Sequence, residues 1–155
     1  MALTKADIKN NYPLPVYNYK VDVAGETIGF SEVSGLNRSY ERIIYKESKT
    51  EGGAGPNIMR MPGQITDVNI TMKKGYVKAK NIEKLYTWIN GTALNQIEKK
   101  DITVSLCDEA GEPVVTWTVF NAFPIKLEAP SFNATTNEAA IESMELVVDF
   151  VTMSE

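Results

Sequence analysis

The sequence alternates polar and apolar residues with a period of two over much of its length, and this alternation most constrains its fold. In residues 16–24, "VYNYKVDVA", Tyr17, Tyr19, Val21 and Val23 alternate with polar neighbours. Such a pattern predicts a strand with one buried face. Further strands are predicted at residues 37–46, 64–74, 101–108, 114–120, 122–129 and 140–152. The 155 residues therefore predict a single, mainly β domain.

One segment instead has the helical period. Its apolar stripe consists of Ile82, Leu85, Tyr86 and Ile89. A short helix is predicted over residues 81–90, with Asn81 as its N-cap and a left-handed Gly91 after its end. So short a helix needs a sheet to pack on. Trp88 lies beside the stripe, which suits either a contact outside the subunit or ordinary core packing.

The residue types present exclude several classes of site. The chain has no histidine, so a Ser-His-Asp triad, a Cys-His pair and a histidine zinc site are impossible. Cys107 is the only cysteine and ends an apolar alternation, as a small buried residue would. The carboxylate pairs Asp108–Glu109 and Glu142–Glu145 fit a charged exterior better than an acid–base pair. We therefore expect no enzyme activity and no cofactor.

The charge and the N-terminal residues bear on partners and location. A net charge of −4 disfavours a broad basic face for nucleic acid. The first residues, "MALTKADIKNNYPLPV", contain no apolar core of a secretory signal, and no run approaches a membrane span. We expect a protein that is made in the cytoplasm and does not insert into a membrane.

A glycine-rich stretch, "TEGGAGPNIMRMPGQ", separates two of the predicted strands at residues 50–64. It lacks the Gly-Lys-Ser/Thr of a phosphate loop and precedes a strand, not a helix, so nucleotide binding is disfavoured. The strands also carry polar faces. An eight-stranded barrel from one chain could hold one small ligand, but polar strand faces suit a larger barrel that is built from several chains around a polar channel.

The stretch "YPLPVYNYKVDVAGETIGFSEVSGL" resembles the opening of tail tube proteins of contractile phages, and more closely the inner-tube subunits of extracellular contractile injection systems. The resemblance continues in order through "MPGQ", "ITMKKG", "LYTWIN", "LNQIEKKDITVSL", "DEAGEPVVTWTVFNAFP" and "ATTNEAAIESMELV". It covers about residues 12–153 and leaves 1–12 as an N-terminal extension. The stretch "TEGGAGPNI" looks longer than the family's usual connection.

The resemblance implies a two-sheet, sandwich-like or barrel-like subunit with one short helix. It also implies hexameric rings, to whose inner β-barrel each subunit gives four strands, stacked into a tube. Implied partners are the sheath, baseplate and cap proteins and a protein cargo, without stable nucleic-acid binding. The function implied is mechanical, in a particle assembled in the bacterial cytoplasm and released. Alternatives are a phage tail tube that passes DNA, the more distant haemolysin-coregulated protein, and a monomeric ligand-binding barrel.

The resemblance also assigns roles to residues of this chain. Residues 47–63 are expected to form an arm that contacts the adjacent subunit or the next ring. Its apolar anchors are Ile58, Met59 and Met61. The arm begins at Glu47, and the residues expected to govern its backbone flexibility are Gly52, Gly53, Gly55, Pro56, Pro62 and Gly63. A mildly acidic channel wall, partly offset by Lys73 and Lys126, is expected from Asp67, Asn69, Thr71, Ser143, Glu145 and Asp149. The helix, with Ile82, Leu85, Tyr86, Trp88 and Ile89, is expected on the outside of that barrel.

Overall fold

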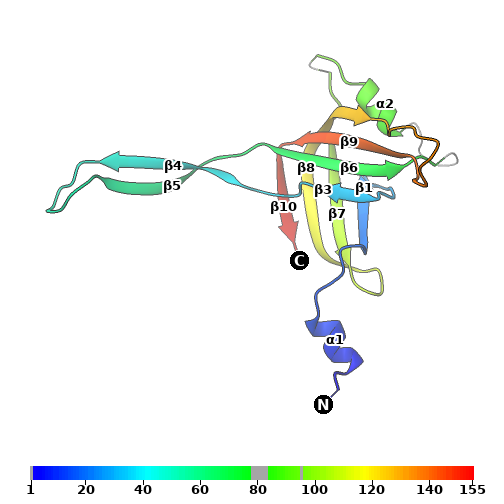
Figure 1. Cartoon of the computed structure of the whole chain (residues 1–155), viewed down its shortest axis with the longest axis horizontal. Helices are drawn as coiled ribbons and strands as arrows, with labels where there is room; N and C mark the ends of the chain where they lie inside the picture. Colours follow the sequence, from blue (N-terminus) through cyan, green and yellow to red (C-terminus); the bar gives the residue numbers. More distant parts are fainter. Residues whose placement is uncertain (1, 78–83, 95) are drawn as a thin grey trace.

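A computed structural model describes residues 2–77, 84–94 and 96–155 of the chain. It consists mainly of β-strands, as the alternation predicts, with two short helices (Figure 1). In chain order the elements are α1 (Lys5–Asn11), β1 (Tyr19–Val23), β2 (Glu26–Thr27), β3 (Glu32–Ser34), β4 (Tyr40–Glu47), β5 (Asn57–Ile65), β6 (Val68–Gly75), α2 (Lys84–Asn90), β7 (Lys100–Cys107), β8 (Pro113–Glu128), β9 (Ile141–Val148) and β10 (Phe150–Ser154).

Two layers of strands share the long strand β8. The first half of β8 pairs with β7 on one side and β10 on the other, and β1 and β2 extend this first sheet beyond β7. The second half of β8 pairs with β9, which is followed by β6 and β3 in a four-stranded second sheet. The strand order runs from β2 to β3 without closing, so the described residues do not form the closed barrel of the ligand-binding alternative.

A bend at Asn121 lets β8 pass from one sheet to the other. Asn121 has a positive φ of 54°, which asparagine tolerates better than most residues. Its backbone N–H donates to Asp101 at 3.0 Å, and its side-chain amide donates to Asp149 at 2.8 Å. The two strands predicted at 114–120 and 122–129 are therefore one strand with a corner.

The same corner divides the strand predicted at 140–152 into β9 and β10 at Asp149. The alternation of residues 140–152 predicts that Met144, Leu146, Val148 and Phe150 share one face. The first three point into the core, but Phe150 is 37% exposed and stacks on Phe120. Val151 takes the buried position instead. The predicted phase is correct up to Val148 and wrong beyond it, because the break shifts the alternation by one residue.

The core lies between the two sheets and under α2. Strand β6, from Val68 to Gly75, and strand β9, from Ile141 to Val148, alternate strictly between buried and half-buried or exposed positions, as the sequence predicts for half-buried strands. The buried cluster contains Val21, Val23, Ile28, Val68, Ile70, Met72, Leu85, Trp88, Ile102, Val104, Val119, Ala122, Met144, Leu146, Val148 and Val151. Cys107 is buried, as expected.

Two glycines take backbone conformations that their places require. Gly111, in the turn between β7 and β8, has a φ of 80°, a conformation that favours glycine and lets the chain reverse there. Gly35 has a φ of 91° and passes so close to β6 that a Cβ would lie 2.3 Å from the carbonyl oxygen of Asn69. Gly91 does not take the predicted left-handed conformation, and its N–H instead bonds to the carbonyl of Thr87.

Helix α2 packs on the sheet through a different stripe from the predicted one. Leu85 and Trp88 are 4% and 6% exposed, whereas Tyr86 is 58% exposed. The inward position of Leu85 is confirmed. The inward position of Ile89 is confirmed too, because Ile89 packs against the core. The inward position of Tyr86 is wrong, because Trp88 and not Tyr86 shares the buried face with Leu85. Of the two roles left open for Trp88, core packing is the one observed. Ile82 and Asn81 lie outside the described residues.

The glycine-rich stretch is the tip of a long hairpin, and its second half is a strand that the sequence analysis missed. Strands β4 and β5 form a two-stranded sheet of their own. We call residues 40–65 the arm. The arm extends away from the body and begins well before Glu47, the start predicted from the sequence (Figure 1). Ile65 belongs to the arm and not to the strand predicted from residue 64 onward.

Candidate assembly surfaces

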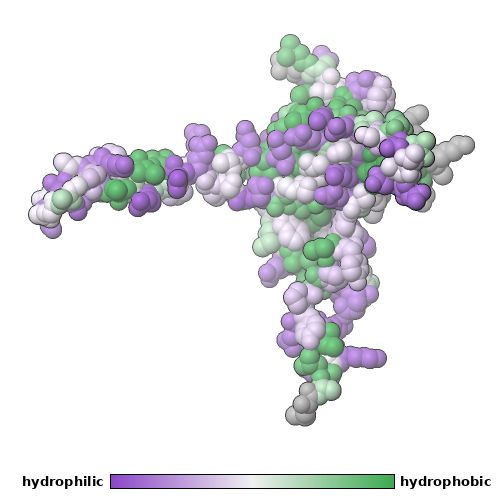
Figure 2. Space-filling model, in the orientation of Figure 1, coloured by the Kyte–Doolittle hydropathy of each residue, from purple (hydrophilic) through white to green (hydrophobic). Residues whose placement is uncertain are grey.

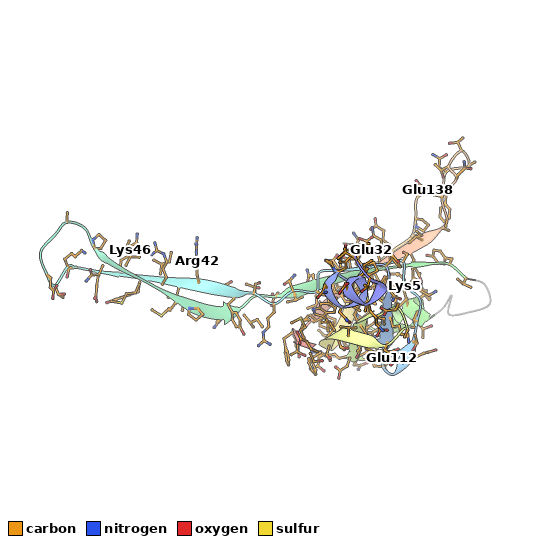
Figure 3. The ribbon with its side chains drawn as sticks, turned by 90° about the horizontal axis from the view of Figure 1, so that it is seen from below. Lys5, Glu32, Arg42, Lys46, Glu112 and Glu138 are labelled. Atoms are coloured by element: carbon orange, nitrogen blue, oxygen red, sulfur yellow. The ribbon has the colours of Figure 1, made fainter. Side chains whose placement is uncertain are left out.

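The arm has two chemically different faces. Directly opposed residues of antiparallel strands share a face, so the pairs Ile43–Met61 and Tyr45–Met59 lie together on one side. We call this side the apolar face. The opposite side, the basic face, is formed by Arg42 and Pro62, Ile44 and Arg60, and Lys46 and Ile58. Arg42 and Lys46 point to the same side of the hairpin in Figure 3.

The apolar side chains of the arm are not covered by the subunit. Ile43, Tyr45, Met59 and Met61 are between 43% and 49% exposed, and Ile58, on the basic face, is 44% exposed. Figure 2 shows hydrophobic residues at the surface along the arm. The three anchors predicted from the sequence are thus exposed on the arm but divided between its faces. Large apolar side chains on a projecting hairpin need a partner to remove them from water.

A second surface is the outer face of the four-stranded sheet β3–β6–β9–β8. Four of the predicted channel residues occupy it: Asn69 and Thr71 on β6, and Ser143 and Glu145 on β9. The amide of Asn69 donates to Glu145 at 3.4 Å, and Thr71 lies directly opposite Glu145. The sheet therefore has one apolar face in the core and one polar face outside it.

The charges on this outer face are largely paired. Lys73 lies 3.2 Å from Glu32, and Lys126 lies 3.6 Å from Glu128. Asp149, at the corner, lies 4.0 Å from Lys99. Asp67 precedes β6 and is exposed. The surface has a mild excess of carboxylates, and the lysines lie among them.

Glu142 is a buried acid that the sequence analysis placed on a solvated face. It is 2% exposed, and its Oε1 has no hydrogen-bond partner. It lies opposite Lys74, which is 5% exposed. The sequence signal for its burial is the alternation of β9: Glu142 lies two residues before the buried Met144 and therefore on the same face. Burial raises the pKa of Glu142, although Lys74 and a hydrogen bond with Tyr76 act to lower it.

Replacing Glu142 with glutamine should stabilise the subunit at neutral pH. The raised pKa means that the folded state holds the proton more tightly than the unfolded chain, whose carboxyl titrates near 4.5. The free energy of unfolding should therefore fall as the pH rises from 4.5 through the raised pKa. The raised pKa of Glu142 is the net result of burial and of the attraction to Lys74. The charged carboxylate therefore destabilises the fold even with Lys74 beside it, and the Glu142→Gln subunit should unfold at a higher temperature than the parent.

Thermal unfolding at several pH values measures this effect. Glu145→Gln is the matched control, since it removes a carboxylate from the opposite face of the same strand and should leave the pH dependence in place. A Glu142→Gln subunit that is less stable than the parent at neutral pH would contradict the prediction.

The N-terminal extension is a short helix that stands at the end of the body opposite α2 (Figure 1). Thr4 and Asp7 form a reciprocal capping box, and the hydrogen bonds from Thr4 lower the pKa of Asp7. The ammonium of Lys9 lies 3.2 Å from the carboxylate of Glu109 in the turn between β7 and β8. This exposed ion pair is the contact through which α1 meets that turn.

Neither a metal site nor a membrane-spanning helix is found in the described part of the chain. No group of three or more histidine, cysteine, aspartate or glutamate side chains there is placed to hold a metal ion. No helix in the described ranges is long and apolar enough to span a membrane.

Comparison with known proteins shows the family of the chain. The family model described as T4-like virus tail tube protein gp19 matches residues 15–152. No curated protein matches the chain. A chain from the sheath–tube complex of an extracellular contractile injection system, PVC, in its extended state, is 44% identical over 99% of both chains, with a TM-score of 0.88.

Two further solved structures are similar over most of their length. A chain of the sheath/tube terminator of the PVC system is 45% identical over 94% of this chain and 99% of that chain, with a TM-score of 0.85. A chain from the tube-terminating cap of the anti-feeding prophage, AFP, is 43% identical over 99% of both chains, with a TM-score of 0.84. The family match spans both sheets and the arm, and the chain therefore belongs to the T4-like virus tail tube protein family.

Proposed function

We propose that the protein is a structural subunit of the inner tube of a contractile injection system. The observation that carries this proposal is the likeness, at more than 40% identity and over nearly the whole chain, to chains of the PVC and AFP tube assemblies. The exposed arm and the polar outer sheet face are what a stacking tube subunit needs. The role is mechanical: the tube is a conduit that sheath contraction drives through a target envelope.

The second sheet is suited to closing a barrel between copies. Its edges are β3 and the second half of β8, because β7 leaves β8 at Ala122 and no strand of the described ranges continues beyond it. Neighbouring strands in the order β3–β6–β9–β8 are all antiparallel. Because the number of strands is even, the two edge strands run in opposite directions. The β8 edge of one copy therefore runs antiparallel to the β3 edge of the next copy. Closing the ring in this way removes both exposed edges.

The polar outer face of that sheet becomes the channel wall in the proposed tube. Asp67, Asn69, Thr71, Ser143, Glu145 and Asp149 then lie along the lumen, with Lys73, Lys99 and Lys126 close to carboxylates. A wall with little unpaired charge holds cargo weakly, whatever its sign. This suits the passage of protein cargo and disfavours stable binding of nucleic acid.

Six copies per ring, stacked rings, and contacts with sheath, baseplate and cap proteins complete the proposal. The neighbours come from sheath–tube, terminator and cap structures, which supports these partners. Within the tube, α2 would face outward, on the sheath side. We also propose assembly inside the producing cell and release of the finished particle.

Electron microscopy of the purified protein and of the native particle tests the proposal. We expect rings with six-fold symmetry that stack into hollow tubes, and elution on size exclusion far above the 17.2 kDa of one chain. A subunit that stays monomeric inside its native particle, or forms rings of another symmetry, would refute it. Packaged DNA in the lumen of the native particle would instead support a phage tail tube.

A further inference from the structure

The inner face of the second sheet ends in charged residues at one end of the sheet. On β6 and β9, the last apolar pair of this face is followed by the pair Lys74–Glu142, whose members are 5% and 2% exposed. This end, where β6 finishes and β9 begins, lies away from the arm (Figure 1). A bond from the Tyr76 N–H to the Ala140 carbonyl, at 3.1 Å, continues the pairing just past the end of β6. Two ionisable side chains therefore close the core at this end.

Glu142 has few neighbours that could stabilise a negative charge. Its carboxyl forms a hydrogen bond with Tyr76, but Oε1 has no partner. The ammonium of Lys74 donates to a backbone carbonyl at 3.3 Å. The pairing of β9 with β8 ends at Glu128, one pair short of Glu142, and the carboxylates of Glu128 and of Glu32 on β3 lie on the outer face beside lysines. Among the described residues, the titratable groups that face Glu142 are thus Lys74 and Tyr76.

The two protonation states of Glu142 fit this site differently. A neutral carboxyl can remain in a dry site with one hydrogen bond, whereas a carboxylate there needs several partners or water. Burial accordingly raises the pKa of Glu142, although Lys74 and Tyr76 act to lower it. Tyr76 and Ile141, beside the site, are 39% and 36% exposed. Water is therefore close, and separating the last residue pairs of β6 and β9 would bring it to an ionised Glu142.

We propose that Glu142 acts as a proton-controlled latch at this end of the second sheet. The latch is closed while Glu142 carries a proton. When the carboxyl is ionised, the last residue pairs of β6 and β9 separate and admit water. The closed state binds the proton more tightly than the open state, in which Glu142 lies in water and titrates near 4.5. Closing is therefore favoured fully below pH 4.5 and weakens as the pH rises through the raised pKa of the closed state.

The latch is a property of the fold of one chain and does not depend on the proposed tube function. In the proposed tube, the second sheet forms the channel wall. The pH would then determine how firmly one end of that wall is held in each subunit.

Amide hydrogen exchange of the full chain, measured between about pH 4 and pH 9, tests the latch. The protection factor compares each amide with the same amide in an unstructured chain, which removes the intrinsic effect of pH. In the parent, protection of the Tyr76 amide should fall by up to about tenfold for each pH unit between 4.5 and the raised pKa, because opening releases one proton. Glu142→Gln should abolish this fall. Glu145→Gln, on the outer face of the same strand, is the matched control and should retain it.

Two further measurements separate the latch from unfolding of the whole subunit. Ile28 is buried, and its N–H donates to the Val21 carbonyl at 3.0 Å, so its exchange reports global unfolding. Protection at Tyr76 should be at least about tenfold lower than at Ile28, and equal protection would overturn the latch. Tyr76→Phe removes a hydrogen bond that lowers the pKa of Glu142, so the fall should extend to higher pH. A parent protein without any fall, or an equal fall in the Glu142→Gln protein, would also overturn the latch, whether or not the protein forms tubes.

Discussion

Replacing Tyr45 and Met59 together with serine should abolish tube formation while leaving the subunit folded. The two side chains are directly opposed on the apolar face of the arm and are 49% and 45% exposed in the lone subunit. Complete burial of a large apolar side chain contributes about 1.5–3 kcal/mol, and about half of each of these side chains is still exposed, so losing both weakens each arm contact by roughly 1.5–3 kcal/mol. That is a factor of about 10 to 100 in the association constant, and it recurs at every subunit.

The stability of the subunit itself should change little. Neither side chain packs in the core, and the cross-strand pair that they form contributes only about 0.2–1 kcal/mol to the hairpin. Thermal unfolding of the dissociated subunit and electron microscopy of the assembled protein measure the two effects separately.

A matched control distinguishes the face of the arm from its general hydrophobicity. Ile44 and Ile58 are 45% and 44% exposed but lie on the basic face. Replacing both with serine removes as many large apolar side chains and should leave tubes intact. Equal loss of assembly in the two double variants, or normal tubes from the Tyr45→Ser/Met59→Ser protein, would contradict the role of the apolar face.

The sequence predicts the body of this subunit better than it predicts the arm, and the reason is physical. Strands β6 and β9 each have one face in the core, so their burial alternates as their residues do. Strand β5 has no buried face within the subunit: Met59 and Met61 alternate with Ile58 and Arg60, all exposed. With apolar residues on both of its faces and none of them buried, β5 lacks the strict polar and apolar alternation by which half-buried strands are recognised. The resemblance identified the segment as an arm, but not as a hairpin.

The other failures have local causes. Asn121 and Asp149 form the corner between the sheets through their mutual hydrogen bond, and no periodic pattern of residues predicts such a contact. Glu142 is a charged residue at a buried position. Its charge favoured an exposed face, although its spacing from Met144 and Leu146 places it on the buried one. On α2, Leu85 fits both the predicted and the observed stripe. Only the tertiary contacts decide whether Tyr86 or Trp88 shares its face.

Replacing Trp88 with alanine should have the largest effect on the stability of the subunit. Helix α2 is only seven residues long and cannot persist without packing. Trp88 anchors it in three ways: its ring is buried, its Nε1–H donates to the carbonyl of Glu98 at 2.8 Å, and the ammonium of Lys100 lies 5.0 Å from the ring centroid. Removing a buried tryptophan costs about 3–5 kcal/mol, a large share of the roughly 5–15 kcal/mol that stabilises a typical domain.

Two further variants divide this effect into its parts. Trp88→Phe keeps most of the apolar volume but leaves the Glu98 carbonyl without its donor, so it should cost about 1–3 kcal/mol. Tyr86→Ala, on the exposed side of the same helix, should change the free energy of unfolding by less than about 0.5 kcal/mol. Denaturant unfolding of the dissociated subunit measures all three. If Trp88→Ala left that free energy unchanged while tubes failed to engage their sheath, Trp88 would be a surface contact. Its burial on the sheet, together with the bond to Glu98, instead predicts that folding fails before assembly does.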